Sequence, residues 1–143
     1  MDTTPINERL AQIRKCLLVL RGFQPMSYEE FVSNYLYTDT AEHNFQVAIQ
    51  AALDIGSIIL ADQAVWVPRG YKDIFPKLAE IGVLPPDFAQ TLIGMAKFRN
   101  VLVHLYLEVD LELVYRYLQE NLDDFGIFAR YVSEWLQTHT DEG

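Results

Sequence analysis

The segment that decides the fold of this 143-residue chain is TAEHNFQVAIQAALDIGSIILADQ, residues 40–63. Its apolar and small side chains recur every three or four positions, which predicts one long helix with an apolar face. Asp39 and Glu42 form a capping-box pattern, so we expect this helix to begin at Thr40 and to end near Gln63. A helix this long and this apolar is expected to lie at the centre of a helical bundle.

The rest of the chain shows the same helical periodicity, and no segment alternates apolar and polar residues as a strand does. A capping box at Ser27 and Glu30, the Pro85–Pro86 pair, a cap at Asp110 and several glycines divide it into expected helices. These cover residues 6–20, 28–35, 71–81, 87–106 and 111–138. The last of these should face the core with Leu113, Tyr117, Leu118, Leu122, Phe125, Phe128, Val132 and Trp135. The predicted fold class is all-α: a single domain over residues 1–143, folded as a largely antiparallel bundle of about five helices.

Composition limits the functional classes. Half of the residues are hydrophobic and 22% are charged, as in a globular domain. The net charge of −9 argues against a nonspecific nucleic-acid-binding protein, which would carry a basic face. Lys97 and Arg99 nevertheless lie together, so the local field near them can differ from the global one. The acidity also fits association with a basic protein partner.

The chain carries few signs of a metal, a disulfide or a membrane span. Cys16 is the only cysteine, which excludes an intramolecular disulfide and a cysteine-rich zinc site, and we expect it in the core. His43 lies near Asp39 and Glu42, but we expect a solvated histidine there and no metal site. No apolar run approaches the roughly 18 residues of a membrane span and no signal-peptide pattern is present, so we expect a cytoplasmic protein.

The stretch FRNVLVHLY, residues 98–106, carries the functional signal. It places Arg99, Asn100, His104 and Tyr106 in an otherwise apolar helix, where burying a charge without a partner is costly. A guanidinium beside an imidazole, which transfers protons near neutral pH, suits cleavage of a phosphodiester. The motif therefore indicates chemistry rather than packing.

The helical spacing sets the possible roles. Asn100 and His104 share a face one turn apart, whereas Arg99 and His104 are about 140° apart around the axis. The long arginine could wrap toward the imidazole, or a second copy across a two-fold axis could complete the site. His104 would move a proton at a ribose 2′-hydroxyl or at the leaving 5′-oxygen, and Arg99 would neutralise the transition-state charge. Asn100 would hold His104 or a phosphate oxygen, and the reaction needs no metal or cofactor because RNA supplies the nucleophile.

The order Arg99, Asn100, His104, Tyr106 resembles the signature of HEPN-superfamily ribonucleases, and its R-x-x-x-x-H-x-Y form resembles HepT toxins of MntA–HepT toxin–antitoxin modules. The stretches AALDIGSIIL and PPDFAQTLIGMAKFRN and the aromatic closing helix are also similar to that family. The resemblance implies a homodimeric, metal-independent ribonuclease that acts on RNA such as tRNA or mRNA at a cleft between protomers. It also implies a minimal nucleotidyltransferase antitoxin that AMPylates the motif tyrosine, here Tyr106. Negative charge and bulk at that position would repel an RNA phosphate.

Each motif residue also has a purely structural interpretation. His104 could be a core histidine bonded to a backbone carbonyl or an acid, and Arg99 could form a salt bridge to Glu108 or Asp110. Tyr106 could be an ordinary interface aromatic. The alternative function is then a non-catalytic helical dimer that binds a partner nucleotidyltransferase and presents substrate to it, which the acidic composition favours.

Overall fold

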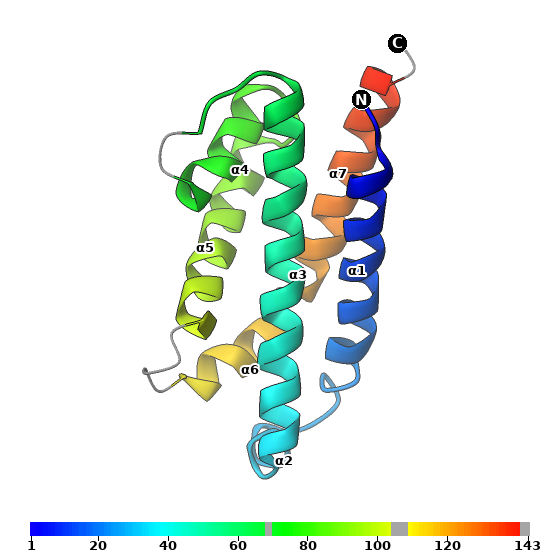
Figure 1. Ribbon diagram of the computed structural model, residues 1–143. Helices are drawn as coiled ribbons and strands as arrows, with labels where there is room; N and C mark the ends of the chain where they lie inside the picture. The colour runs from blue at the N-terminus through cyan, green and yellow to red at the C-terminus, as the bar shows by residue number, and fades with distance from the viewer. Residues whose placement is uncertain (68–69, 104–108, 141–143) are drawn as a thin grey trace.

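The computed structural model describes residues 1–67, 70–103 and 109–140, and within these ranges the chain forms seven α-helices and no strand. The four long helices are α1 (Thr4–Arg21), α3 (Tyr35–Asp62), α5 (Pro86–Val103) and α7 (Leu122–Thr140). The three short ones are α2 (Tyr28–Val32), α4 (Tyr71–Glu80) and α6 (Leu111–Glu120). The long helices alternate in direction, with α3 in the middle of the view (Figure 1). The all-α, largely antiparallel bundle is confirmed, with seven helices rather than about five.

The single helix expected over residues 111–138 is wrong, because the chain bends at Asn121 between α6 and α7. The Asn121 side-chain amide donates to a carboxylate oxygen of Asp124 at 3.1 Å, and the Asp124 N–H donates to the Asn121 carbonyl. These local bonds give the backbone an alternative to continuing the helix. As a result α6 crosses the end of the bundle while α7 runs back along it (Figure 1).

The expected start of the longest helix is also wrong, since α3 begins at Tyr35 rather than at Thr40. The Asn34 side chain accepts a hydrogen bond from the Leu36 N–H at 2.9 Å and caps the helix more than a turn earlier. Asparagine is as strong an N-cap as aspartate, so the Asp39 pattern does not mark the start. The cap at Ser27 is confirmed, because its hydroxyl accepts from the Glu30 N–H at 3.1 Å.

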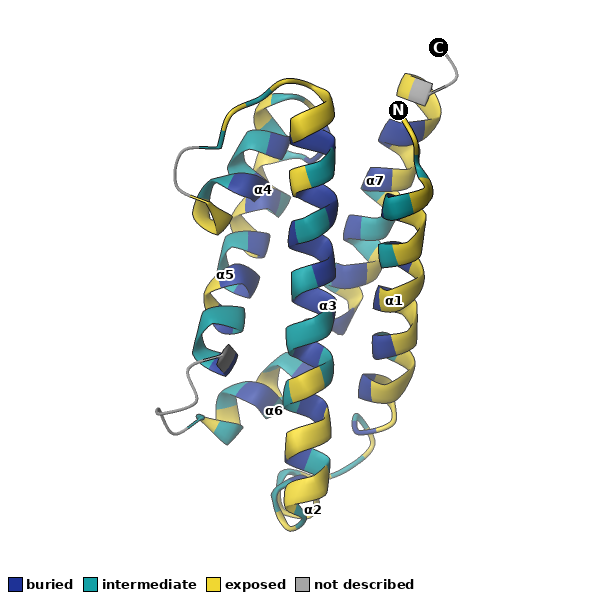
Figure 2. Ribbon diagram, in the orientation of Figure 1, coloured by how far each residue is buried: buried dark blue, intermediate teal, exposed yellow. Residues whose placement is uncertain are grey.

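The core surrounds α3, whose inner face is buried along most of its length (Figure 2). Among the described helices, α3 is long and apolar enough to cross a membrane, but 56% of its most apolar window is buried among the other helices. Cys16 is buried as expected. The expected inward stripe of α6 and α7 is confirmed: Leu113 and Tyr117 are partly buried, and the fully buried members are Leu118, Leu122, Phe125, Phe128, Val132 and Trp135.

A glycine brings α4 close to α3. A Cβ atom added at Gly56 would collide with Cγ2 of Ile74 and would lie 3.1 Å from Cδ1 of Leu78. The missing side chain therefore allows the two helices to pack closely at this point. This contact places the first residue of α4, Tyr71, beside the middle of α3 and close to the motif helix α5.

Candidate active site

The orientation of α5 is set by Phe98, the residue that precedes the motif arginine. Its buried ring stacks on Tyr117, with centroids 4.0 Å apart and planes inclined by 3°. The Tyr117 hydroxyl donates to the Gly94 carbonyl at 3.2 Å, and burial raises the pKa of this phenol, so the donor stays protonated. Because successive residues turn by about 100°, a core position for Phe98 carries Arg99 and Asn100 out of the core on two different sides of α5.

Three uncharged groups hold the Arg99 guanidinium. Its Nη2 donates to Gln50 Oε1 at 2.7 Å, and its Nη1 lies 3.4 Å from Asn100 Oδ1. The guanidinium carbon sits 5.0 Å from the centroid of the Tyr71 ring, within the range of a cation–π interaction. Within the described ranges, none of these partners is a carboxylate. The positive charge is fixed in place, and no carboxylate of the described part of the chain neutralises it by direct contact.

The expected structural alternative for Arg99 was a salt bridge to Glu108 or Asp110. The Asp110 carboxylate instead caps α6, accepting from the N–H groups of Glu112 and Leu113 at 3.0 and 3.3 Å. Glu108 lies outside the described residues. The cap at Asp110 was itself expected from the sequence and is confirmed.

A second layer of polar groups orients Gln50. Its Nε2 donates to Asp54 Oδ1 at 2.8 Å and to the Tyr71 hydroxyl at 3.3 Å, so its carbonyl oxygen is turned toward Arg99. The other oxygen of Asp54 pairs with Arg9 Nε of α1 at 3.5 Å. A polar chain thus runs from α1 through α3 to α5, and its only carboxylate reaches Arg99 through an amide rather than directly.

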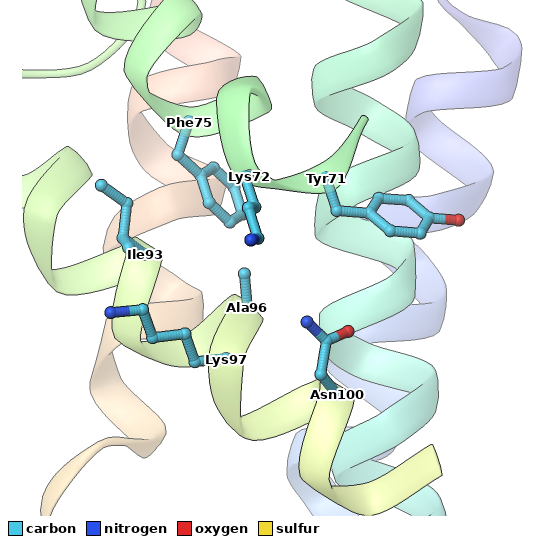
Figure 3. A pocket seen from close by; sticks show the side chains of 7 residues that line it. All are labelled: Tyr71, Lys72, Phe75, Ile93, Ala96, Lys97 and Asn100. Atoms are coloured by element: carbon cyan, nitrogen blue, oxygen red, sulfur yellow. The ribbon is translucent and has the colours of Figure 1, made fainter. Parts of the chain in front are cut away.

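The surface is hollowed on both sides of the Arg99–Asn100 pair. On the α3 side a groove contains Arg99, Gln50, Asp54 and further amides of α1 and α3. On the α4 side a pocket of about 200 Å³ opens between α4 and α5, with Asn100 and Tyr71 at one end (Figure 3). The Arg99–Asn100 pair therefore lies on a ridge between two hollows. One is lined mainly by amides, and the other by apolar side chains and two lysines.

The sequence-predicted site residues divide into two groups. The structure brings Arg99 and Asn100 together near the end of α5. His104 and Tyr106 lie outside the described residues, as do the last positions of the helix expected over residues 87–106. His43 is exposed on α3, and in the described part of the chain no three His, Cys, Asp or Glu side chains gather as metal ligands would.

Comparison with known proteins identifies the family. The model of the family described as HepT-like, Ribonuclease HepT-like, matches residues 6–132. The chain belongs to the HepT-like ribonuclease family. The resemblance of the chain to HepT toxins, expected from the sequence, is thereby confirmed.

Three relatives illustrate how far the HepT-like similarity extends. An mRNA nuclease HepT of Shewanella oneidensis is 27% identical over 123 residues, covering 86% of this chain and 92% of that protein. A tRNA nuclease HepT of Aphanizomenon flos-aquae is 26% identical over 137 residues, covering 96% and 93%. The fold matches the tri-AMPylated Shewanella oneidensis HEPN toxin, solved in complex with an MNT antitoxin, with a TM-score of 0.84 and 25% identity over 94% and 99% of the two chains.

Sequence reasoning missed the residues that hold Arg99 in this HepT-like chain. The sequence pattern places Gln50 and Asp54 in an apolar helix and Tyr71 at the start of a short one. A signal was present, because Gln50 and Asp54 are polar residues four apart in AIQAALDIG and so share one face of α3. Tyr71 gives no comparable signal, since only packing of α4 brings its ring over Arg99.

Proposed function

We propose that this HepT-like chain is the toxin of a toxin–antitoxin module and an endoribonuclease that cleaves RNA, such as tRNA or mRNA, without a metal ion. Membership of the family and the nuclease names of two relatives support this activity. The observation that carries the proposal is the Arg99 guanidinium, which is held at the end of α5 by neutral groups. A purely structural arginine would be expected to pair with a carboxylate, whereas an uncompensated charge attracts a phosphate.

In the proposed reaction the substrate supplies the nucleophile. His104 removes the proton of a ribose 2′-hydroxyl, whose oxygen attacks the neighbouring phosphorus, and the leaving 5′-oxygen takes up a proton. The products are a 2′,3′-cyclic phosphate and a 5′-hydroxyl. Arg99 stabilises the added negative charge on the phosphoryl oxygens with its planar set of donors. Asn100, 3.4 Å from the guanidinium, orients either His104 or a phosphate oxygen.

We propose a homodimer with the site at a cleft between protomers. The sequence expectation of one continuous helix through residue 106 would separate Arg99 from His104 by five positions, about 140° around its axis. A two-fold axis near the end of α5 would bring Arg99 of one copy toward His104 of the other. The active unit in this proposal has two equivalent sites.

We propose that a minimal nucleotidyltransferase antitoxin silences the enzyme by AMPylating Tyr106 in the cytoplasm. The matching solved structure of a tri-AMPylated HEPN toxin with its MNT antitoxin supports this. In the transfer, the Tyr106 phenol oxygen bonds to the α-phosphorus of ATP, pyrophosphate leaves and the phenol proton is released. The attached phosphate sits two residues from His104 and competes with RNA phosphate for Arg99.

The activity is tested with purified, unmodified wild type and with the His104→Ala variant. Each is incubated with total tRNA in EDTA, and the product ends are identified by mass. We expect cleavage by the wild type alone, with cyclic phosphate ends. Absence of cleavage by a folded wild-type dimer would overturn the proposal in favour of the non-catalytic binding module, which the net charge of −9 suits better.

The regulation is tested with Tyr106→Phe, expressed with and without the nucleotidyltransferase. We expect this variant to arrest growth in both cases, because the ring is kept while the acceptor oxygen is lost. Intact-mass spectrometry of the wild type should show added AMP units that the variant lacks. If the antitoxin silenced the variant equally well, masking or another modified residue would be responsible.

A further inference from the structure

The pocket between α4 and α5 differs in chemistry from the rest of this acidic molecule. Its volume is about 200 Å³ and its floor is apolar, formed by Ile93 and Ala96 with the fully buried Phe75 behind them. Two lysines also line it: Lys72 extends from α4 over Ala96, and Lys97 extends from α5 toward the Ile93 side, away from Asn100 (Figure 3). Among the described residues that line it, none is a carboxylate.

The charge balance makes this pocket unusual. The whole chain carries 20 acidic and 11 basic residues, yet the described residues that line the pocket include two lysines and no acid. The groove on the other side of Arg99 contains the Asp54 carboxylate and three glutamine amides. An anion approaching Arg99 therefore meets two lysines on the α4 side, whereas on the α3 side it meets amides and a carboxylate that is already paired with Arg9.

The pocket also connects directly with the motif. Asn100 and Tyr71 line its end, and the same two side chains contact the Arg99 guanidinium. A chain of nucleotides whose phosphate lies on Arg99 would therefore place its next nucleotide over this pocket. The volume is smaller than the roughly 300–1,000 Å³ of pockets for drug-sized ligands, which suits one base rather than two.

We propose that this pocket is the binding subsite for the nucleotide that adjoins the scissile phosphate of the RNA. The base lies against the apolar floor of Ile93 and Ala96, and the phosphate of that nucleotide lies near Lys72 or Lys97. Apolar surface for a base combined with cationic groups for the backbone is the usual means of binding single-stranded nucleic acid. The proposal rests on the proposed ribonuclease function and adds where its substrate binds.

The test measures binding separately from cleavage. A fluorescent 2′-O-methyl tetranucleotide, which has no free 2′-hydroxyl to attack, is titrated with full-length protein at several salt concentrations, and anisotropy is recorded. We expect Lys72→Gln and Lys97→Gln each to weaken binding by about three- to tenfold. Each should also reduce the slope of log K against log salt by about 0.7, the value for one phosphate contact on a single strand.

Lys77→Gln is the matched control, since it makes the same change on the same helix. Lys77 pairs with Glu80 at 3.1 Å and does not line the pocket. We expect its affinity and salt slope to equal those of the wild type. An equal loss in Lys77→Gln would mean that general charge is responsible and would overturn the subsite.

The position of the base is tested by filling the floor and by removing the base. Ala96→Leu should weaken binding about tenfold while its melting temperature shows that the bundle is intact. An abasic tetranucleotide of the same charge should bind the wild type weakly. Its affinity should be about the same as that of the Ala96→Leu variant for the intact tetranucleotide. If the intact and abasic oligonucleotides bound wild type equally, the base would lie elsewhere and the proposal would be overturned.

The two proposals fail in different ways. If wild type cleaves tRNA and all the pocket variants bind and cleave as wild type does, the ribonuclease stands and the subsite is wrong. If wild type does not cleave but binds the tetranucleotide with the expected dependence on Lys72 and Lys97, the pocket is supported as a nucleic-acid site and the ribonuclease proposal is wrong.

Discussion

The two sides of α5 near Arg99 and Asn100 are lined by side chains of different chemistry. On the α3 side, Gln50 holds the Arg99 guanidinium, and Asp54 and Arg9 back it through hydrogen bonds and an ion pair. On the α4 side, the neighbouring Asn100 faces a pocket with an apolar floor and two lysines. One residue of helical rotation, about 100°, separates them. The difference teaches that adjacent motif residues can serve separate tasks. The α3 side fixes the charge of Arg99, and the α4 side, at Asn100, is the proposed binding site of the substrate.

The largest effect is expected from removing the charge that both sides share. Arg99→Ala should lower kcat/KM on tRNA by about 10³-fold, because a preorganised donor to the transition-state charge is lost. Arg99→Lys should recover little, since an ammonium lacks the planar set of donors. The control is Arg130→Ala, which removes another arginine placed over a tyrosine ring, with 5.6 Å between guanidinium carbon and centroid. Comparable activity of Arg99→Ala and wild type would contradict the mechanism.

The packing that brings the two sides together is tested at two glycines. Gly56→Ala should lower the free energy of unfolding by about 1–3 kcal/mol through overpacking against Ile74 of α4, despite the better helix propensity of alanine. Gly126→Ala in α7, where an added Cβ meets no atom within 4 Å, should raise it by roughly 0.5–1 kcal/mol. Urea denaturation monitored by circular dichroism checks both. Two changes of the same sign would contradict the close α3–α4 contact.

Substitution of Gln50 tests the α3 side of Arg99 by itself, because Gln50 holds the guanidinium in position. Gln50→Leu should lower kcat by about tenfold with little change in KM, because the guanidinium loses a short charge-assisted hydrogen bond and its preferred orientation. Gln50→Glu should instead raise KM, since a carboxylate would pair with Arg99 and compete with phosphate. Gln46→Leu, in the same groove, is the control and should behave as wild type. If Gln50→Leu and Gln46→Leu had the same kinetics, Gln50 would have no positioning role.

The smallest effect is expected at Arg9, which lies at the α1 end of the polar chain that leads through Asp54 and Gln50 to Arg99. Arg9→Ala should change the cleavage rate by less than about twofold and the free energy of unfolding by less than about 1 kcal/mol. The reason is that the Arg9–Asp54 pair is partly exposed and screened by solvent. Steady-state kinetics and thermal melts at two salt concentrations check this. A loss as large as that of Gln50→Leu would mean that α1 controls the guanidinium through Asp54, and the positioning side would then extend across the whole bundle.

The fold was largely predictable because helical periodicity is a local property. The long central helix, the caps at Ser27 and Asp110 and the start of α5 at the Pro85–Pro86 pair were all visible in the sequence. The start of α3 was not, since Asn34 and Asp39 are both good caps and each is worth only about 1 kcal/mol. The bend at Asn121 was also hidden. The apolar stripe continues at helical spacing across it, so periodicity alone could not reveal a change of direction.

The candidate site was predictable only in part, because sequence patterns report local properties and not contacts between distant segments. A charged or ionisable side chain in an apolar helix is conspicuous, which is why Arg99, Asn100, His104 and Tyr106 could be selected from the order of residues. Two of the partners of Arg99 are ordinary residues in distant segments. Gln50 lies 49 positions from Arg99, and Tyr71 becomes relevant only because its ring lies over the guanidinium.

The order of residues therefore establishes the helical class, the family motif and the chemistry that the motif can perform, because these depend on residue types at short spacings. Tertiary packing decides what surrounds the motif. The close contact at Gly56 and the core position of Phe98 turn Arg99 toward an amide and Asn100 toward a cationic pocket. Contacts between helices arise from shape and burial over the whole chain, and no local pattern encodes them.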